Sequence, residues 1–457
     1  MANLIKNGTV ITENGEEKLD ILMENGKIAA MSPQISGEGH SVYDAAGCIV
    51  FPGFIDAHTH LDMDNGVTVT ADNFDSGTAA ALCGGTTTLL DFATQNKGET
   101  LHEALTNWHK KADGNCNCNY GFHMAITDWN ENVAAEIPEL CEMGVTSFKL
   151  YMAYDALRLS DAAIYEVLCA VGKNHGIVGV HCENGDLVNE LIKKELSLGH
   201  NGISAHPISR PDYVEAEAIT RYCAIAKAAN TPIHIVHLST EQGMLSARNA
   251  RKNGQKIYIE GCPQYFTLDD SLYLLPGFEG AKYVCSPPLR GKSDVKALWL
   301  ALTNGEINSI STDHCSFNFA TQKSLGKDNF SKIPNGMPGI EHRGAVMLSA
   351  ALERGIPYSQ MAKLLSGNAA RLFGLYASKG SIAIGKDADI TVWNPDEDFT
   401  ITAAEMHQNV DYTPYEGMHL RGRIKGVFLS GELCSDSGNL LKPKQGYFTS
   451  REVSEYF

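Results

Sequence analysis

The chain has 457 residues, of which 43% are hydrophobic and 20% charged, and its formal net charge at pH 7 is −17. These proportions are typical of a soluble globular protein with room for one barrel of about 250 residues and an accessory unit. The acidic balance argues against a nucleic-acid or anionic-membrane partner, and no apolar run is as long as a membrane helix. The chain start lacks the apolar core of an export signal, so we expect a cytoplasmic protein with reduced cysteines.

Both ends of the chain have the pattern of β-structure. The first fifty residues alternate apolar and polar positions, and Asn-Gly pairs beginning at Asn7, Asn14 and Asn25 interrupt them. Asn-Gly between alternating runs predicts a tight hairpin, because both residues tolerate positive φ. The same alternation returns at 380–393 and 424–431. The predicted division is a β-sandwich domain of residues 1–52 and 376–457 around a middle domain of residues 53–375.

The middle of the chain alternates strand-like and helix-like segments. Helix-like stretches include 100–111, 161–174, 215–229 and 240–253. Eight apolar runs read as strands, at 54–60, 86–93, 120–127, 147–152, 178–183, 233–237, 256–262 and 307–313. Eight strand–helix repeats predict a (β/α)8 TIM barrel of the α/β class. Glycine-rich phosphate loops are absent from the sequence, so nothing in it supports a nucleotide cofactor.

Five of these strands end in side chains that bind metals. The residues are His58 and His60 on the first strand, then Lys149, His181, His237 and Asp313 on four others. In a parallel barrel the carboxyl ends of all strands open onto one face, where catalytic groups gather. Residues distant in sequence would therefore meet around one point, as in a two-metal hydrolase.

Strand parity gives an independent test of this grouping. Side chains at positions i and i+2 share a face, which directs His58 and His60 into the barrel together. The same alternation places Lys149 inward, and it groups His237 with the inward face while turning His234 outward. A single strand histidine is more often a hydrogen-bonded core group than a ligand. A lysine inside an apolar strand, however, needs a partner or a shifted pKa, and the combination favours a functional site.

Several motifs in combination resemble those of the dihydropyrimidinase / D-hydantoinase group, phenylhydantoinase-like members included, of the amidohydrolase superfamily. The resemblance extends over essentially the whole chain. The motifs are PGFIDAHTH (52–60), GGTTT (84–88), SFKLYMAY (147–154), HCENG (181–185), VHLS (236–239), SPPLR (286–290), TDHC (312–315), IPNG (333–336) and DYTPYEG (411–417).

The resemblance implies a binuclear zinc centre. Lys149 would be carboxylated by CO2 to N6-carboxylysine and bridge the two ions. One ion would be bound by His58, His60 and Asp313, and the other by His181 and His237. A carbamate offers two anionic oxygens where a neutral amine is a poor bridge, and imidazole suits zinc.

The resemblance also implies a reaction. A hydroxide bridging two zinc ions would attack the ring carbonyl of a cyclic ureide, and Asp313 would act first as general base and then as general acid. Tyr154 would donate its hydroxyl to the developing oxyanion. Ser286 and Asn335 would bind the ring imide largely through their backbone groups. The expected product is an N-carbamoyl amino acid, and the expected assembly is a homotetramer.

Substrate choice is the least determined feature. Asp62 stands where dihydroorotase-like relatives carry an arginine that holds a substrate carboxylate, which disfavours dihydroorotate. Allantoin stays open, because it is itself a substituted hydantoin. A non-catalytic scaffold of the same fold is a further alternative, although such relatives lack the metal ligands that are complete here. The side chains expected to line the pocket for the ring substituent are Met63, Val67, Met152 and Leu157.

Overall fold

The computed structural model describes residues 2–455, and its centre is an eight-stranded parallel barrel. The strands follow one another around the sheet in chain order. They are β8 (Phe54–Thr59), β9 (Thr86–Thr94), β10 (Asn119–Ala125), β11 (Ser147–Tyr151), β12 (Ile177–His181), β13 (Ile233–Ile235), β14 (Ile257–Gly261) and β15 (Ser309–Ile310). Beyond the end of β15, the His60 N–H donates to the carbonyl of His314 at 2.8 Å, which links the last strand segment back to the first. The predicted TIM barrel is confirmed.

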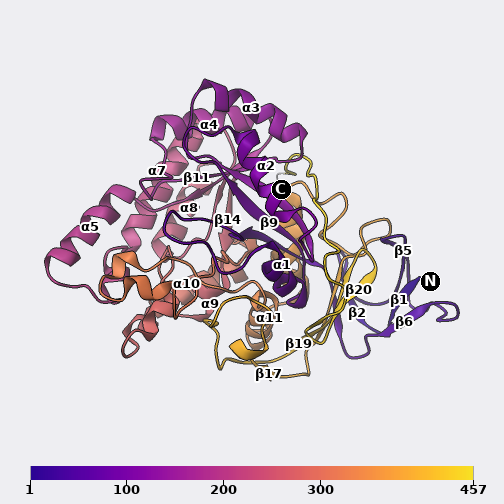
Figure 1. Ribbon diagram of the computed structural model, residues 1–457. Helices are drawn as coiled ribbons and strands as arrows, with labels where there is room; N and C mark the ends of the chain where they lie inside the picture. Colours follow the sequence, from indigo (N-terminus) through magenta and orange to yellow (C-terminus); the bar gives the residue numbers. More distant parts are fainter. Residues whose placement is uncertain (1, 456–457) are drawn as a thin grey trace.

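Helices form the outer ring of the barrel (Figure 1). They are α1 (Phe74–Cys83), α2 (Leu101–Ala112), α3 (Glu131–Glu142), α4 (Asp161–Lys173), α5 (Gly185–Ser197), α6 (Ala205–Ile208), α7 (Asp212–Ala229), α8 (Glu241–Lys252), α9 (Pro263–Thr267), α10 (Lys292–Thr303), α11 (Arg343–Glu353), α12 (Tyr358–Ala362) and α13 (Asn368–Leu372). Helix α2 shows why they form where they do. Thr100 and Glu103 make a capping box at its start, and Leu101, Leu105 and Trp108 fall on one buried face.

A two-layer β-structure lies beside the barrel, at the right of Figure 1. One layer has the order β5-β4-β1-β6 and the other the order β21-β20-β19-β16-β7-β2-β3, with a separate β17-β18 pair. The strands are β1 (Asn3–Lys6), β2 (Thr9–Thr12), β3 (Gly15–Lys18), β4 (Asp20–Glu24), β5 (Lys27–Ser32), β6 (Ser41–Asp44), β7 (Ile49–Pro52), β16 (Ile390–Asn394), β17 (Phe399–Thr400), β18 (His419–Leu420), β19 (Arg423–Leu429), β20 (Glu432–Asp436) and β21 (Asn439–Leu440).

This β-structure combines both ends of the chain, because β7 pairs with both β2 and β16. Ile5 and Ile21 from one layer share a buried cluster with Val50 and Ile390 from the other. The two layers therefore close over a common apolar core as a sandwich. The boundaries predicted at 52/53 and 375/376 stay a prediction.

The last described residues leave the sandwich and run along the barrel (Figure 1). Tyr120 donates to the carbonyl of Tyr447 at 3.1 Å and accepts from the N–H of Thr449 at 2.7 Å. The buried guanidinium of Arg451 donates to Ser147 Oγ at 2.6 Å and to the carbonyl of Phe122. This last segment therefore packs against the barrel strands.

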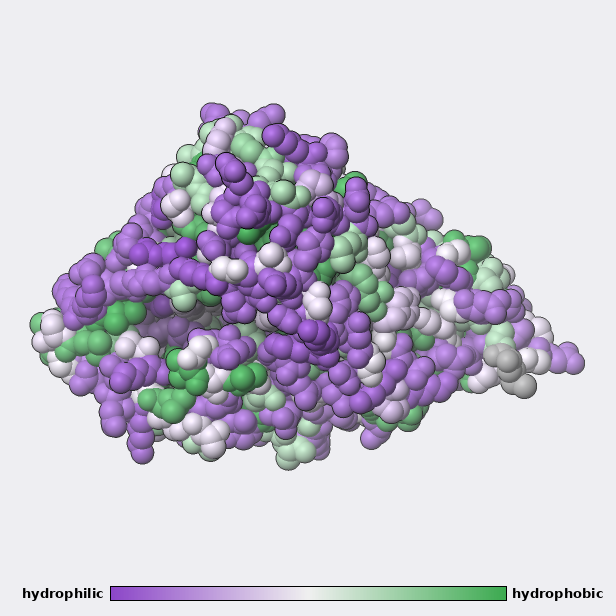
Figure 2. Space-filling view, turned by 45° about the horizontal axis from the view of Figure 1, so that its top comes forward, coloured by the Kyte–Doolittle hydropathy of each residue, from purple (hydrophilic) through white to green (hydrophobic). Residues whose placement is uncertain are grey.

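The surface has the hydrophilic character that the charged content of the sequence predicts. The face in Figure 2 is mostly hydrophilic, and apolar residues form small separate groups on it. Among the described residues, no helix has both the length and the apolar character needed to cross a bilayer. All twelve cysteines lie in the described part of the chain and are free, as predicted.

Candidate metal centre

Three of the predicted ligands meet at the carboxyl-terminal mouth of the barrel. The Nε2 atoms of His58 and His60 each lie 3.2 Å from Oδ1 of Asp313, and the three ligand atoms are all within 4.8 Å of one another. Asp313 adopts a φ of 54°, a left-handed conformation that is uncommon outside glycine. Strained backbone of this kind is concentrated at functional sites, where it directs side chains. Here it accompanies the approach of the carboxylate to both imidazoles.

The other two histidines adjoin this group. Nδ1 of His181, at the end of β12, lies 3.0 Å from Nε2 of His237. The His237 ring is centred 5.4 Å from that of His58. His237 also has a left-handed backbone, with a φ of 37°. The four histidines and Asp313 therefore form one continuous cluster, although they come from four different strand ends.

Lys149 completes the cluster from β11. Its side chain is buried, and its Nζ lies 5.1 Å from the centre of the Phe92 ring, which itself contacts the rings of His58 and His60. Burial lowers the pKa of Lys149 to about 8, although the negative charges of Asp313 and Glu260 oppose this shift. The neutral amine, about a tenth of the total at pH 7, is therefore far more abundant than for an ordinary lysine.

The pKa values of the histidines follow from the same environment. Burial lowers the pKa of His60 to about 4 and that of His237 well below its ordinary value. Burial also acts to lower the pKa of His58, but the Glu260 carboxylate reverses that effect and raises it. Asp313 is buried too, yet the neighbouring His58 and His60 hold its pKa well below the ordinary range. The carboxylate is consequently ionised.

Two buried glutamates that the sequence did not predict as site residues hold the outer nitrogens of the ligand histidines. Oε1 of Glu260, on β14, lies 2.7 Å from Nδ1 of His58 and accepts from the N–H of His237 at 3.0 Å. Oε2 of Glu183 lies 2.8 Å from Nε2 of His181 and accepts from Arg210 at 2.5 Å. The position of Glu183 within HCENG was the only available signal, since Glu260 lies in an unremarkable strand.

The donor set fits divalent cations of the zinc type. His58 Nε2 is buried and faces Asp313 Oδ1 at 3.2 Å without a hydrogen bond of good geometry, while its other ring nitrogen is held by Glu260. A carboxylate on the outer nitrogen of a metal-binding histidine fixes its tautomer and makes the inner nitrogen more basic. Imidazole nitrogens and a carboxylate oxygen are the usual ligands of zinc in hydrolytic sites.

The predicted substrate residues lie around the same mouth. Tyr154 adopts a φ of 68°, and its ring is centred 5.2 Å from that of His181 and 5.6 Å from the Arg210 guanidinium. Burial raises the pKa of Tyr154 to about 12, against the influence of Arg210, so the phenol stays a proton donor. The Ser286 hydroxyl is buried close to the Tyr154 phenol and makes no hydrogen bond of good geometry. The Asn335 loop is joined to the Ser286 loop by the Gly336 N–H, which donates to the carbonyl of Val284 at 3.0 Å.

The structure corrects one parity argument. His234 was predicted to point outward, yet it lines a small interior cavity together with Lys149, Ser147 and Val236. Strand β13 ends at Ile235, and the left-handed residue His237 lies beyond that end. Simple alternation therefore fails between 235 and 237, and both histidines of this segment reach the barrel interior.

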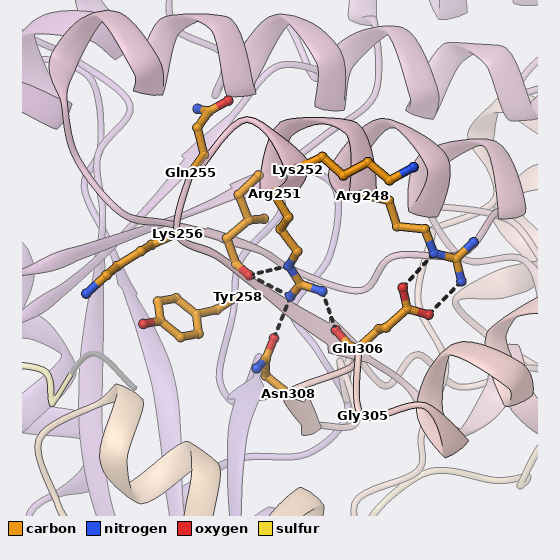
Figure 3. A pocket seen from close by; sticks show the side chains of 10 residues that line it. Arg248, Arg251, Lys252, Gln255, Lys256, Tyr258, Gly305, Glu306 and Asn308 are labelled. Atoms are coloured by element: carbon orange, nitrogen blue, oxygen red, sulfur yellow. Dashed lines mark hydrogen bonds and ion pairs between the residues drawn. The ribbon is translucent and has the colours of Figure 1, made fainter.

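A second and larger pocket is of a different kind. It has a volume of about 590 Å³ and lies near the start of β14, where Arg248, Arg251 and Lys252 project from α8 (Figure 3). Nε and Nη2 of Arg248 donate to the two carboxylate oxygens of Glu306, at 2.6 and 2.7 Å. Arg251 donates to the carbonyls of Ile257 and Glu306 and to the side chain of Asn308. Its guanidinium groups are thus already bonded within the protein.

The sequence comparison decides the family. Residues 49–434 match the Amidohydrolase family. The chain belongs to this family. The D-hydantoinase of Geobacillus stearothermophilus is 43% identical over 455 residues, which are 99% of this chain and 97% of that protein. The D-phenylhydantoinase of Escherichia coli O9:H4 (strain HS) is 36% identical over 99% of this chain and 98% of its own length.

Solved structures of this amidohydrolase group agree. The dihydropyrimidinase from Brevibacillus agri NCHU1002 has a TM-score of 0.98 at 39% identity, with 99% of each chain covered. The L-hydantoinase (dihydropyrimidinase) from Arthrobacter aurescens is more distant, with a TM-score of 0.89 at 26% identity and 98% and 99% of the two chains covered. The predicted resemblance to the dihydropyrimidinase / D-hydantoinase group is confirmed.

Proposed function

We propose that this protein hydrolyses the cyclic amide bond of hydantoins or dihydropyrimidines to give N-carbamoyl amino acids. The observation that carries the proposal is the convergence of four histidines, Asp313 and a buried lysine at the carboxyl-terminal mouth of a barrel. The names of the relatives, D-hydantoinase and D-phenylhydantoinase, support the same class of substrate.

Two zinc ions are the proposed cofactors. His58, His60 and Asp313 would hold one ion, His181 and His237 the other, and a carboxylated Lys149 would join them. When bound, the ions would acidify a shared water and polarise the ring carbonyl. The lowered pKa of Lys149 supports its modification, because only a neutral amine can form a bond to the carbon of CO2. The nitrogen forms a bond to the carbon as one C=O π bond of CO2 opens, and the neutral amine releases one proton to solvent and keeps one N–H.

Asp313 is the proposed general base and acid. Its carboxylate is ionised and lies at the centre of the cluster, so it can take a proton from the attacking water. Returning that proton to the ring nitrogen lets the amide C–N bond break and the nitrogen leave as a neutral group. Tyr154 is a phenol with a high pKa beside His181, which suits it to donate a hydrogen bond to the oxyanion.

Backbone groups at Ser286 and Asn335 are the proposed binding partners of the ring imide. The two loops that carry them are hydrogen-bonded to each other at the edge of the site. Asp62, which is expected to disfavour a carboxylated ring, accepts a hydrogen bond from the N–H of Phe74 at 3.2 Å. Of the residues predicted to surround the ring substituent, Met152 is buried, Leu157 packs beside Tyr151, and Val67 is exposed.

The decisive experiment combines a substrate panel with metal analysis on one sample. We expect about two zinc ions per chain and ring opening of hydantoin, dihydrouracil and their alkyl- and aryl-substituted forms, with the D-enantiomers preferred. Opening of allantoin alone would favour an allantoinase. Metal-replete protein that opens none of these rings would refute the proposal, and a protein that folds and assembles without metal would favour a scaffold.

The remaining expectations concern assembly and location. A homotetramer follows from the resemblance alone, and light scattering on the purified protein would measure the mass directly. A cytoplasmic location follows from the sequence of the chain start and is tested by fractionating cells that express the protein.

A further inference from the structure

Lys323 is a fully buried lysine outside the metal centre. It begins the short helix η3 (Lys323–Gly326), in the connection that follows β15. Among the described residues, no carboxylate pairs with it. Its Nζ donates instead to three backbone carbonyls, those of Val284 at 2.8 Å, Pro334 at 2.7 Å and Gly336 at 2.7 Å. An ammonium has three donors, so all of them are used.

Burying the Lys323 ammonium without a carboxylate partner costs free energy, so its position calls for an explanation. Moving an ammonium out of water is costly, and a carboxylate partner is the usual compensation. Burial lowers the pKa of Lys323 to about 7, which shows how far the surroundings disfavour its charge. The buried Lys379 is a useful contrast, because it lies 2.9 Å from Asp387 and 2.6 Å from Asp389.

The three carbonyls belong to the two loops that carry the proposed substrate residues. Val284 precedes Ser286 by two positions, and Pro334 and Gly336 stand on either side of Asn335. One ammonium therefore joins a loop that follows β14 to a loop that follows β15.

The bonds to Lys323 and Val284 also fix the direction of the Asn335 peptide groups. A trans peptide is planar, with its C=O and N–H pointing in opposite directions. Because the Pro334 carbonyl binds Lys323, the Asn335 N–H in the same peptide unit points away from it. Because the Gly336 N–H donates to the carbonyl of Val284 at 3.0 Å, the Asn335 carbonyl points away from Val284. The Asn335 N–H is thereby directed away from the lysine. The Asn335 carbonyl is directed away from Val284 and lies 3.8 Å from Cys315 Sγ, a weak donor that a ligand N–H can replace.

We propose that Lys323 is a positioning residue for the ring substrate. By binding three carbonyls it sets the spacing of the Ser286 and Asn335 loops and the direction of the Asn335 backbone groups. This inference rests on the proposed function, in which those backbone groups bind the imide of the ring. Lys323 contacts none of the proposed metal ligands through its hydrogen bonds, so it acts on substrate binding and not on the metal centre.

The test compares Lys323→Met with Lys379→Met, which removes an equally buried lysine outside the site. In zinc-loaded Lys323→Met we expect kcat/KM for hydantoin to fall roughly 10–100-fold, mostly through KM, because small misplacements of a bound substrate have effects of this size. Zinc content should equal that of the wild type. Lys379→Met should lose thermal stability while keeping the wild-type KM.

The outcomes separate the two proposals. If wild-type protein opens no ring, the proposed function fails. If wild-type protein opens the ring and folded Lys323→Met keeps the wild-type KM, the inference about Lys323 alone is overturned, and the lysine is only structural. If Lys323→Met does not fold, Lys323→Gln is tested in its place, because the glutamine amide keeps two N–H donors. A raised KM in that variant supports the inference, and a wild-type KM rejects it.

Discussion

The metal centre and the pocket beside α8 are both rich in charged side chains, yet their chemistry differs. In the pocket, the Arg248 and Arg251 side chains already bind Glu306, Asn308 and backbone carbonyls, so most of their donors are engaged within the protein. In the metal centre, buried polar atoms point at one another, and several of them, including His58 Nε2 and His237 Nδ1, have no hydrogen-bond partner. The pocket beside α8 is therefore the weaker candidate for a functional site, although it is larger. A binding site needs buried polar groups that face a common point and lack partners within the protein.

The largest effect is expected from Lys149→Ala, which tests whether the metal centre is the functional site. Removing the proposed bridge should lower zinc content and reduce kcat/KM by more than the roughly 10–100-fold loss typical of residues behind metal ligands. Small carboxylic acids should restore part of the activity by occupying the space that the lysine leaves. Metal analysis and ring-opening assays on the same sample measure both effects. Wild-type turnover without an added acid would show that Lys149 is not the bridge.

A smaller effect is expected from Glu260→Gln, which keeps the shape of the side chain but removes its charge. Because Glu260 lies 2.7 Å from Nδ1 of His58, its loss should weaken the basicity of the inner nitrogen and reduce zinc affinity about 10–100-fold. Glu306→Gln is the matched control, since it removes a carboxylate from the arginine pocket. Competition with a zinc chelator gives both affinities. Equal zinc affinity in the two variants would contradict the role given to Glu260.

The ligand residues could be predicted from the sequence because parallel topology converts strand ends into neighbours. His58 and His181 lie at the ends of β8 and β12, and Lys149 lies in the middle of the short strand β11, so the barrel brings all three toward one face. Glu260 could not be predicted, because its role depends on which side chain lies opposite it across the barrel. His234 was misjudged because alternation fails where His237 adopts positive φ, and backbone angles of that kind are not written in residue type outside glycine.

In the arginine pocket the expected effect is on stability alone. Arg251→Met would remove the donor that Arg251 supplies to the carbonyls of Ile257 and Glu306, and an unpaired buried group costs about 1–3 kcal/mol. Zinc content, KM and kcat should stay at wild-type values. Urea unfolding measures the loss, and ring-opening assays measure the rest. A raised KM in this variant would mean that the pocket takes part in substrate binding.

The smallest effect concerns a histidine that is an ion-pair partner and not a ligand. His407 differs from His60 in the direction of its pKa shift, because a hydrogen bond with Cys83 and another with Glu341 raise the pKa of His407 to about 10, whereas burial lowers that of His60 to about 4. Its Nδ1 lies 2.7 Å from Oε1 of Glu341. A raised folded-state pKa means that the protonated form stabilises the fold.

That stabilisation should be complete below about pH 6.5, the ordinary histidine pKa, and should disappear as the pH rises through about 10. The difference in melting temperature between wild type and His407→Gln should therefore shrink between pH 7 and pH 10. Glu341→Gln, which removes the acceptor, should show the same trend. A difference that stays constant across this range would mean that His407 is held by packing and not by its charge, and it would remove the contrast with the ligand histidines.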